Sequence, residues 1–121
     1  VSWHVAHDEA RAALAEVQAL PAHVVIETYS VLTRLPGAQR LDAGTAAAAL
    51  RALPWPVVAL GAAEHVPLVE QLATAQVVGG ATYDALVAAT ARAHDFTLLT
   101  RDRRARRTYE LLGIRYRFTG A

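Results

Sequence analysis

Three acidic side chains stand in or beside segments that are otherwise apolar. Glu27 is the only formal charge in the stretch PAHVVIETYSVL, and Asp84 lies among Ala, Leu, Val and Thr residues. Asp102 follows the apolar run FTLLT and Arg101. A carboxylate in such surroundings must be paired with a cation, bound to a metal ion or protonated. Because the chain has no lysine and only Asp102 has a cation beside it, these acids are candidates for a functional site.

The chemistry that three such acids could perform follows from their charge. Carboxylates that come together repel one another and raise one another's pKa, unless a cation holds them. Ligation by carboxylate and water oxygens suits Mg²⁺ or Mn²⁺, and such ions lower the pKa of bound water and neutralise charge on a phosphodiester. Each acid alone is a weaker signal, since Glu is common within helices and Asp102 could simply cap the next helix. Together they predict a metal site.

Arginines gather next to the last of these acids. All twelve cations of the chain are arginines, and seven of them lie between Arg101 and the C-terminus. A run of arginines alone is typical of a solvated helix face. Beside an acidic metal site, the same run would supply the positive charge that a phosphate backbone requires. We therefore expect Arg101, Arg103 and Arg104 to bind a nucleic-acid backbone.

Three consecutive elements would position Asp84 and Asp102. Residues 81–93 predict a helix that is buried on most sides, and residues 96–100 predict a short buried strand. The segment from Asp102 to the stop at Gly113 predicts a helix with Ala105, Tyr109 and Leu112 on its apolar side. Asp102 would lie just past the carboxyl end of the strand, at the edge where open α/β sheets bind ligands.

The remaining segments extend this pattern. The other expected helices cover residues 6–20, 21–34, 41–53 and 62–75, and the other expected strands cover 57–60 and 114–118. Asp42 is expected to cap the third of these helices. The fourth is expected to bury Val66, Val69, Leu72 and Ala73. Strands separated by helices imply crossover connections, and therefore a parallel sheet.

Composition limits the protein class. A chain of 121 residues is expected to form a single small domain. Its 54% hydrophobic and 19% charged residues exclude a disordered protein. No apolar run reaches the roughly 18 residues of a membrane span, so we expect no membrane partner. The absence of cysteine excludes disulfides and thiol nucleophiles, and fits a cytoplasmic location. The absence of lysine excludes a Walker-type phosphate lysine and a Schiff base.

The start of the chain departs from this pattern. His4 and His7 have a spacing that could ligate a metal, but nothing nearby converges on them, so a solvated helix start is the preferred interpretation. No strand-like segment precedes the first expected helix, which begins at Ala6.

Three segments resemble one known family. HVVIETYSVLTRL, YDALVAATARAHDFTLLTRD and RRARRTYELLGI are similar to the PIN-domain family, in particular to VapC-type toxins of bacterial toxin–antitoxin pairs. The likeness runs from about Trp3 to Phe118. It implies a three-layer α/β/α sandwich with a mostly parallel sheet and an endoribonuclease that depends on Mg²⁺ or Mn²⁺. It also implies a homodimer that a cognate antitoxin inhibits.

The resemblance also implies roles for individual residues. Glu27 matches the family's helix Glu, Asp84 its third acid, and Asp102 the acid after the late strand. Thr100 matches the hydroxyl residue two positions before that last acid. The family's first acid, at the end of an N-terminal strand, has no counterpart here. We therefore expect one PIN-like domain over residues 1–121 that is N-terminally incomplete, with the strand supplied as a bound peptide, by another chain, or by residues before Val1.

The main hypothesis is thus a ribonuclease toxin in which metal-activated water attacks RNA, with Glu27, Asp84 and Asp102 as catalytic metal ligands. The alternative is a catalytically impaired PIN-like module that binds a partner protein or RNA. A phosphotransfer or dehalogenase-type α/β domain is a weaker third hypothesis, because the first-strand Asp nucleophile and the lysine of those proteins are both missing.

Overall fold

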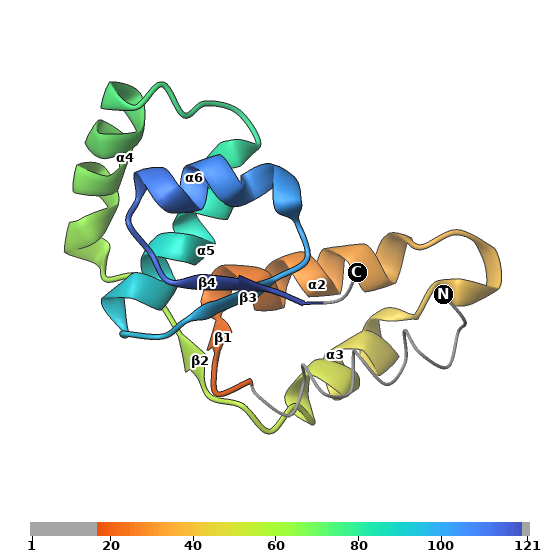
Figure 1. Ribbon diagram of the computed structural model, residues 1–121. Coiled ribbons are helices and arrows are strands. Elements are labelled where there is room, and N and C mark those ends of the chain that lie inside the picture. The colour runs from red at the N-terminus through yellow and green to blue at the C-terminus, as the bar shows by residue number, and fades with distance from the viewer. Residues whose placement is uncertain (1–16, 120–121) are drawn as a thin grey trace. The chain divides into compact units, whose positions relative to one another are not determined.

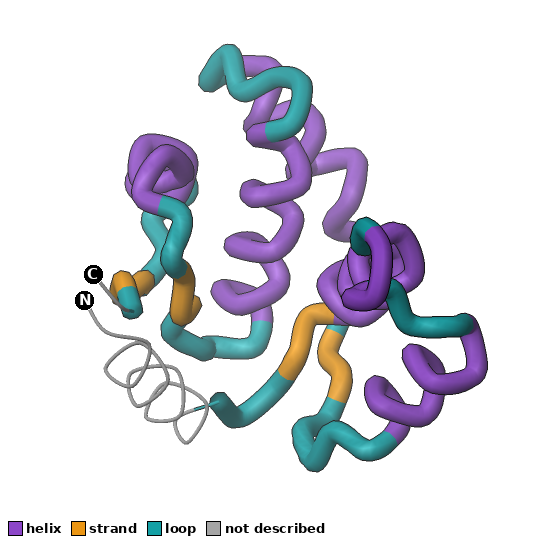
Figure 2. The backbone as a smooth tube through the Cα atoms, turned by 90° about the vertical axis from the view of Figure 1, so that its right-hand side faces the viewer, coloured by secondary structure: helices purple, strands orange, loops and turns teal. Residues whose placement is uncertain are grey.

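A computed structural model describes residues 17–119 of the chain (Figure 1). The chain divides into two compact units, one formed by residues 18–59 and one formed mainly by the residues from Leu60 onward. Within residues 17–119, each unit contains one pair of short strands (Figure 2). Both pairs are parallel. The expected α/β class with parallel strands is therefore confirmed. The expected single domain over residues 1–121 stays a prediction, since each unit is described by itself.

The unit of residues 18–59 is built on two helices and one strand pair. Its elements are β1 (Leu20–Pro21), α2 (Ala22–Arg34), the 3-10 turn η1 (Gly37–Gln39), α3 (Ala43–Arg51) and β2 (Val57–Val58). Leu20 pairs with Val57 and Pro21 with Val58. Asp42 caps α3 as predicted, because its side chain accepts a hydrogen bond of 2.7 Å from the Thr45 N–H.

Two expected boundaries in this unit are wrong. The helix predicted to end at Leu20 does not reach that residue, because residues 17–19 are irregular and Leu20 belongs to β1. Proline at position 21 explains the break, since the residue before a proline is driven away from helical geometry. The strand predicted for residues 57–60 contains only Val57 and Val58.

The second unit carries the segments around Asp84 and Asp102. Its elements are η2 (Ala62–Glu64), α4 (His65–Thr74), α5 (Ala81–Ala93), β3 (Leu98–Thr100), η3 (Arg103–Ala105), α6 (Arg106–Leu111) and β4 (Tyr116–Phe118). Strands β3 and β4 pair from Leu98 with Tyr116 to Thr100 with Phe118. The η3–α6 segment is the crossover that two parallel strands require.

Helices α5 and α6 meet in the core of this unit. The core consists of Leu60, Leu68, Leu72, Ala85, Ala88, Ala89, Ala105, Tyr109, Leu112 and Ile114. The predicted bounds of α5 are confirmed, and small buried alanines let it pack closely. Gly113 ends α6 with a φ of +65°, as predicted for a residue after a helix. Arg92, near the end of α5, donates a hydrogen bond to the Leu112 carbonyl at the end of α6.

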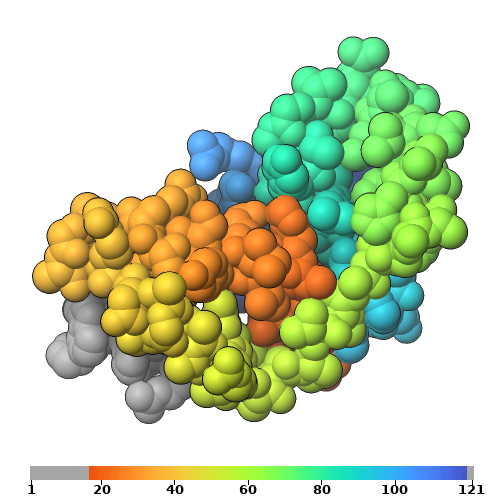
Figure 3. Space-filling model, turned by 180° about the vertical axis from the view of Figure 1, so that it is seen from behind, coloured from red at the N-terminus to blue at the C-terminus, as the bar shows by residue number. Residues whose placement is uncertain are grey.

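The buried side of α4 differs from the expected one. Leu68 and Leu72, one turn apart, are buried, whereas Val66 and Val69 are 68% and 59% exposed. The α4 segment, coloured green, lies at the surface in Figure 3. The prediction is confirmed for Leu72 and wrong for Val66, Val69 and Ala73, which are exposed. Leu68, which the prediction left out, faces the core instead.

Several expectations concern residues 1–16, which lie outside the described part. They include the helix predicted to begin at Ala6 and the His4–His7 pair. Within residues 17–119, no helix has both the length and the apolar character needed to cross a membrane.

Candidate functional site

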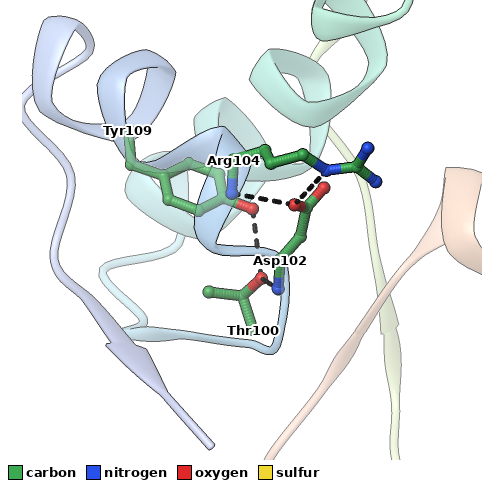
Figure 4. Close-up of polar contacts among 4 residues, drawn as sticks. All are labelled: Thr100, Asp102, Arg104 and Tyr109. Atoms are coloured by element: carbon green, nitrogen blue, oxygen red, sulfur yellow. Dashed lines mark hydrogen bonds and ion pairs between the residues drawn. The ribbon is translucent and has the colours of Figure 1, made fainter.

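Asp102 is held in place from both its backbone and its side chain. It lies two residues beyond Thr100, the last residue of β3, and its own N–H donates a hydrogen bond of 3.1 Å to Thr100 Oγ1. Its Oδ1 accepts a hydrogen bond of 3.0 Å from the Arg104 N–H, which makes Asp102 the cap of η3 (Figure 4). The capping role predicted for Asp102 is thereby confirmed. Its carboxylate is half-buried, so it still has access to a ligand.

Tyr109, a residue of α6, contacts Thr100, the same residue that binds the Asp102 N–H. Its side chain is buried, with 4% of the residue exposed, and its hydroxyl lies 3.2 Å from Thr100 Oγ1. Either of the two hydroxyls can be the donor. The pKa of Tyr109 is raised, first by burial, with smaller contributions from the charges of Asp84 and Asp102, while the Thr100 hydrogen bond acts in the opposite direction. Tyr109 is therefore a neutral hydroxyl at neutral pH.

Asp84 lies in the first turn of α5. It is half-buried, and its charge, like that of Asp102, acts on the Tyr109 hydroxyl. Two acids from different elements thus lie within electrostatic reach of one hydroxyl. The helix dipole adds to this arrangement, because the N-terminal end of a helix favours negative charge. The α5 helix positions Asp84 through the buried alanines that follow it.

Glu27 lies in the other unit, and its surroundings differ from those expected. Its side chain is 60% exposed and pairs with His23, whose Nε2 lies 3.1 Å from Glu27 Oε2. None of the residues of α2, all of which are described, is buried. The apolar neighbours of Glu27 in the sequence therefore do not bury it. Its grouping with Asp84 and Asp102 stays a prediction, because the two units are described separately.

The donor chemistry around Tyr109 suits a hard divalent cation. Mg²⁺ typically binds through one or two carboxylates, keeps several water ligands and uses substrate phosphates as further ligands. Asp84 and Asp102 can supply those carboxylates, so the residues fit the ion that the resemblance implies. Within residues 17–119, no group of three or more His, Cys, Asp or Glu side chains is close enough to hold a metal ion. The three-acid cluster remains a prediction.

The predicted arginines border this site in different ways. Arg101 is exposed, and the Arg104 side chain is 96% exposed with its Nε 3.6 Å from Asp102 Oδ1. Arg103 lies over the Phe118 ring, with 4.5 Å between its Cζ and the ring centroid. Arg103 and Arg104 thus directly follow Asp102 in the chain, and the Arg104 side chain lies next to its carboxylate.

Two residues of this region were not singled out from the sequence. Tyr109 is on the apolar side of its predicted helix, a pattern that indicates a core residue and gives no sign of the Thr100 contact. Phe118 is an apolar position of an alternating strand, and its arginine contacts join residues that are distant in the sequence. The tyrosine at a predicted core position was the one sequence signal for the Tyr109 contact, because a buried phenol needs a hydrogen-bond partner.

Comparisons with known proteins bear on the same residues. The sequence model of the PIN domain matches residues 1–111. Ribonuclease VapC40 of Mycobacterium tuberculosis, in each of two strains, is 46% identical over 114 residues, which cover 93% of this chain and 85% of that protein. Ribonuclease VapC27 of Mycobacterium tuberculosis is 45% identical over 118 residues, which cover 94% of this chain and 84% of that protein. All three matches include the segments that carry Asp84 and Asp102.

Proposed function

The chain belongs to the PIN-domain family, and we propose that it is a metal-dependent endoribonuclease, the toxin of a toxin–antitoxin pair. Its relatives VapC40 and VapC27 are both named ribonucleases, which supports the reaction class. The observation that carries the proposal is that Asp84 and Asp102, from different elements, both act by their charge on the Tyr109 hydroxyl, which contacts Thr100. Exposed arginines beside Asp102 supply the charge that an RNA substrate needs.

In this proposal each residue has a distinct task. Asp84 and Asp102, with Glu27, would hold Mg²⁺ or Mn²⁺. When bound, such an ion would supply a water ligand of lowered pKa and positive charge to neutralise the phosphodiester. Thr100 keeps Asp102 in position through the hydrogen bond from the Asp102 N–H. Arg101, Arg103 and Arg104 attract the RNA backbone and hold the scissile phosphate beside the two acids.

The partners follow from the family. A cognate antitoxin is proposed as the protein that blocks the site, and a second copy of the chain as the other partner. The cytoplasm is the proposed location, because an RNA-cleaving toxin meets its substrate there.

The alternative is a catalytically impaired PIN-like module that binds RNA or a partner protein. It is favoured by the exposed arginines beside Asp102, which need no metal ion to bind a phosphate backbone. Such a module would retain the arginines next to Asp102 and bind RNA without cutting it.

A metal titration with a labelled RNA distinguishes the nuclease from the RNA-binding module. The purified chain is incubated with RNA while Mg²⁺ or Mn²⁺ is raised, and then with excess chelator. The same series is repeated on a chain preceded by the strand and first acid of a PIN-domain relative. Cleavage that requires the metal and is lost in Asp84→Asn supports the nuclease. RNA binding without cleavage in both chains supports the binding module and contradicts the proposal.

A further inference from the structure

Phe118, the last residue of β4, is bordered by two arginines of the crossover segment. The Arg103 Cζ lies 4.5 Å from the centroid of the Phe118 ring, and the Arg106 Cζ lies 5.2 Å from it. Both distances are within the range of a cation–π contact. Phe118 is half-buried, whereas both arginines are exposed. The ring is therefore a support for two guanidinium groups that still face solvent.

The rest of the unit holds this ring firmly. Phe118 packs edge-on against Tyr116, with 5.5 Å between the ring centroids, and Tyr116 lies 5.4 Å from the Tyr109 ring. Phe118 is also the strand partner of Thr100, and the next N–H, that of Thr119, donates to the Thr100 carbonyl at 2.9 Å. The two arginines are thus anchored beside the strand end that leads to Asp102.

A stacked guanidinium keeps its ability to bind phosphate. The five N–H donors of arginine lie in the plane of the group, so a ring against its face leaves those donors free. Ordering a long side chain before binding reduces the conformational entropy that is lost when the ligand arrives. Arg103 and Arg106 should therefore bind phosphate better than equally exposed arginines that have no such support.

We propose that Phe118, Arg103 and Arg106 form a preorganised clamp for adjacent phosphates of one RNA strand. This aromatic clamp rests on the proposed ribonuclease function and extends it, because it specifies which part of the substrate is held and where. Both guanidinium carbons lie within 5.2 Å of the same ring centroid, so each group would bind one of two neighbouring phosphates. The RNA strand then runs from Phe118 toward Asp102, and Phe118 itself is a positioning residue that does not touch RNA.

The test measures binding of a short single-stranded RNA in chelator, so that the strand stays intact. Phe118→Leu keeps an apolar side chain but removes the ring, and we expect roughly three- to fivefold weaker binding, in line with an exposed cation–π contact. The slope of log affinity against log salt should stay unchanged, because no charge is lost. The double variant Arg103→Gln/Arg106→Gln should bind more weakly and lower that slope by about 0.7 for each charge removed.

Three further variants distinguish the aromatic clamp from an effect of positive charge alone or of Phe118 alone. Adding Phe118→Leu to the double glutamine variant should weaken binding no further, since the ring acts only through the two arginines. Arg103→Lys/Arg106→Lys keeps both charges but loses the planar groups, so it should bind more weakly with an unchanged salt slope. Arg107→Gln removes one exposed charge from the same helix. It should lower the slope with a smaller loss of affinity than Arg103→Gln.

Several outcomes would overturn the clamp. Wild-type affinity in Phe118→Leu, or an equal loss from Phe118→Leu in the double glutamine background, would show that the ring does not act through the arginines. If Phe118→Leu does not fold, as judged by thermal unfolding, the lysine variant decides, and wild-type affinity there contradicts the proposal. A folded wild-type chain that binds no RNA would refute the ribonuclease proposal and the clamp together. A chain that binds RNA without any effect of the ring would refute the clamp alone.

Discussion

The Tyr109 hydroxyl lies 3.2 Å from Thr100 Oγ1, and this contact joins α6 to the end of β3. Thr100 Oγ1 also accepts the hydrogen bond from the Asp102 N–H. A continuous chain of hydrogen bonds therefore runs from a buried phenol to the backbone of a candidate metal ligand. The hydrogen bonds in such a chain strengthen one another, so a substitution at one end alters the bonds at the other end.

Asp84→Asn should abolish metal-dependent RNA cleavage and leave the fold intact. The substitution removes a negative charge near Asp102, so the free energy of unfolding without metal should stay level or rise. Cleavage rates and urea unfolding, with the exposed Glu70→Gln as matched control, check both parts. Cleavage at the wild-type rate would exclude Asp84 as a ligand.

Thr100→Val should destabilise the protein by about 1–3 kcal/mol, because the Asp102 N–H and the Tyr109 hydroxyl each lose a partner. Cleavage should fall as well, since Asp102 is no longer held. Thr100→Ser keeps the hydroxyl and should retain most of both properties. Urea unfolding and cleavage assays compare the two variants, and equal damage by Ser and Val would assign Thr100 a packing role instead.

Tyr109 should make stability depend on alkaline pH. Burial and the nearby acids raise its pKa in the folded state. Its contribution to stability is therefore complete below the unfolded pKa of about 10 and is lost as pH rises through the folded pKa. Tyr109→Phe should cost about 1 kcal/mol near neutral pH, through the lost hydrogen bond. Above about pH 10 that difference from wild type should shrink, as urea unfolding at both pH values would show. A constant difference would contradict the raised pKa.

Arg104→Gln should separate RNA binding from stability. The Arg104–Asp102 pair is 3.6 Å long and its arginine is almost fully exposed, so its loss should change the free energy of unfolding by less than about 0.5 kcal/mol. RNA binding should weaken similarly for different sequences, with a salt slope that is shallower by about 0.7. An unchanged slope would move the RNA path away from Arg104.

Leu72→Ala should test which side of α4 supports the core. Leu72 is 4% exposed and packs in the core cluster, so its truncation should cost about 2–5 kcal/mol. Val69→Ala, at a position that is 59% exposed, is the control and should change stability by less than about 0.5 kcal/mol. Similar losses in both variants would contradict the buried stripe of Leu68 and Leu72.

The local features of this protein could be predicted from its residues alone. The α5 helix, the Asp42 cap and the stop at Gly113 depend on neighbouring residues and on backbone preferences that act over a few positions. The same is true of the parallel strand pattern, because helices alternate with strands along the chain. The identity of the candidate acids was also readable, since a carboxylate in an apolar segment has few explanations.

Contacts between side chains of different elements could not be predicted in this way. Tyr109 and Thr100 come from different elements, as do Phe118 and Arg103, and their contacts depend on how β3, β4 and α6 pack. The buried side of α4 was decided in the same way, because a helix with apolar residues on more than one side can turn either of them toward the core. The exposure of Glu27 likewise depends on its surroundings in space, since apolar neighbours along a helix bury a residue only where another element covers that side.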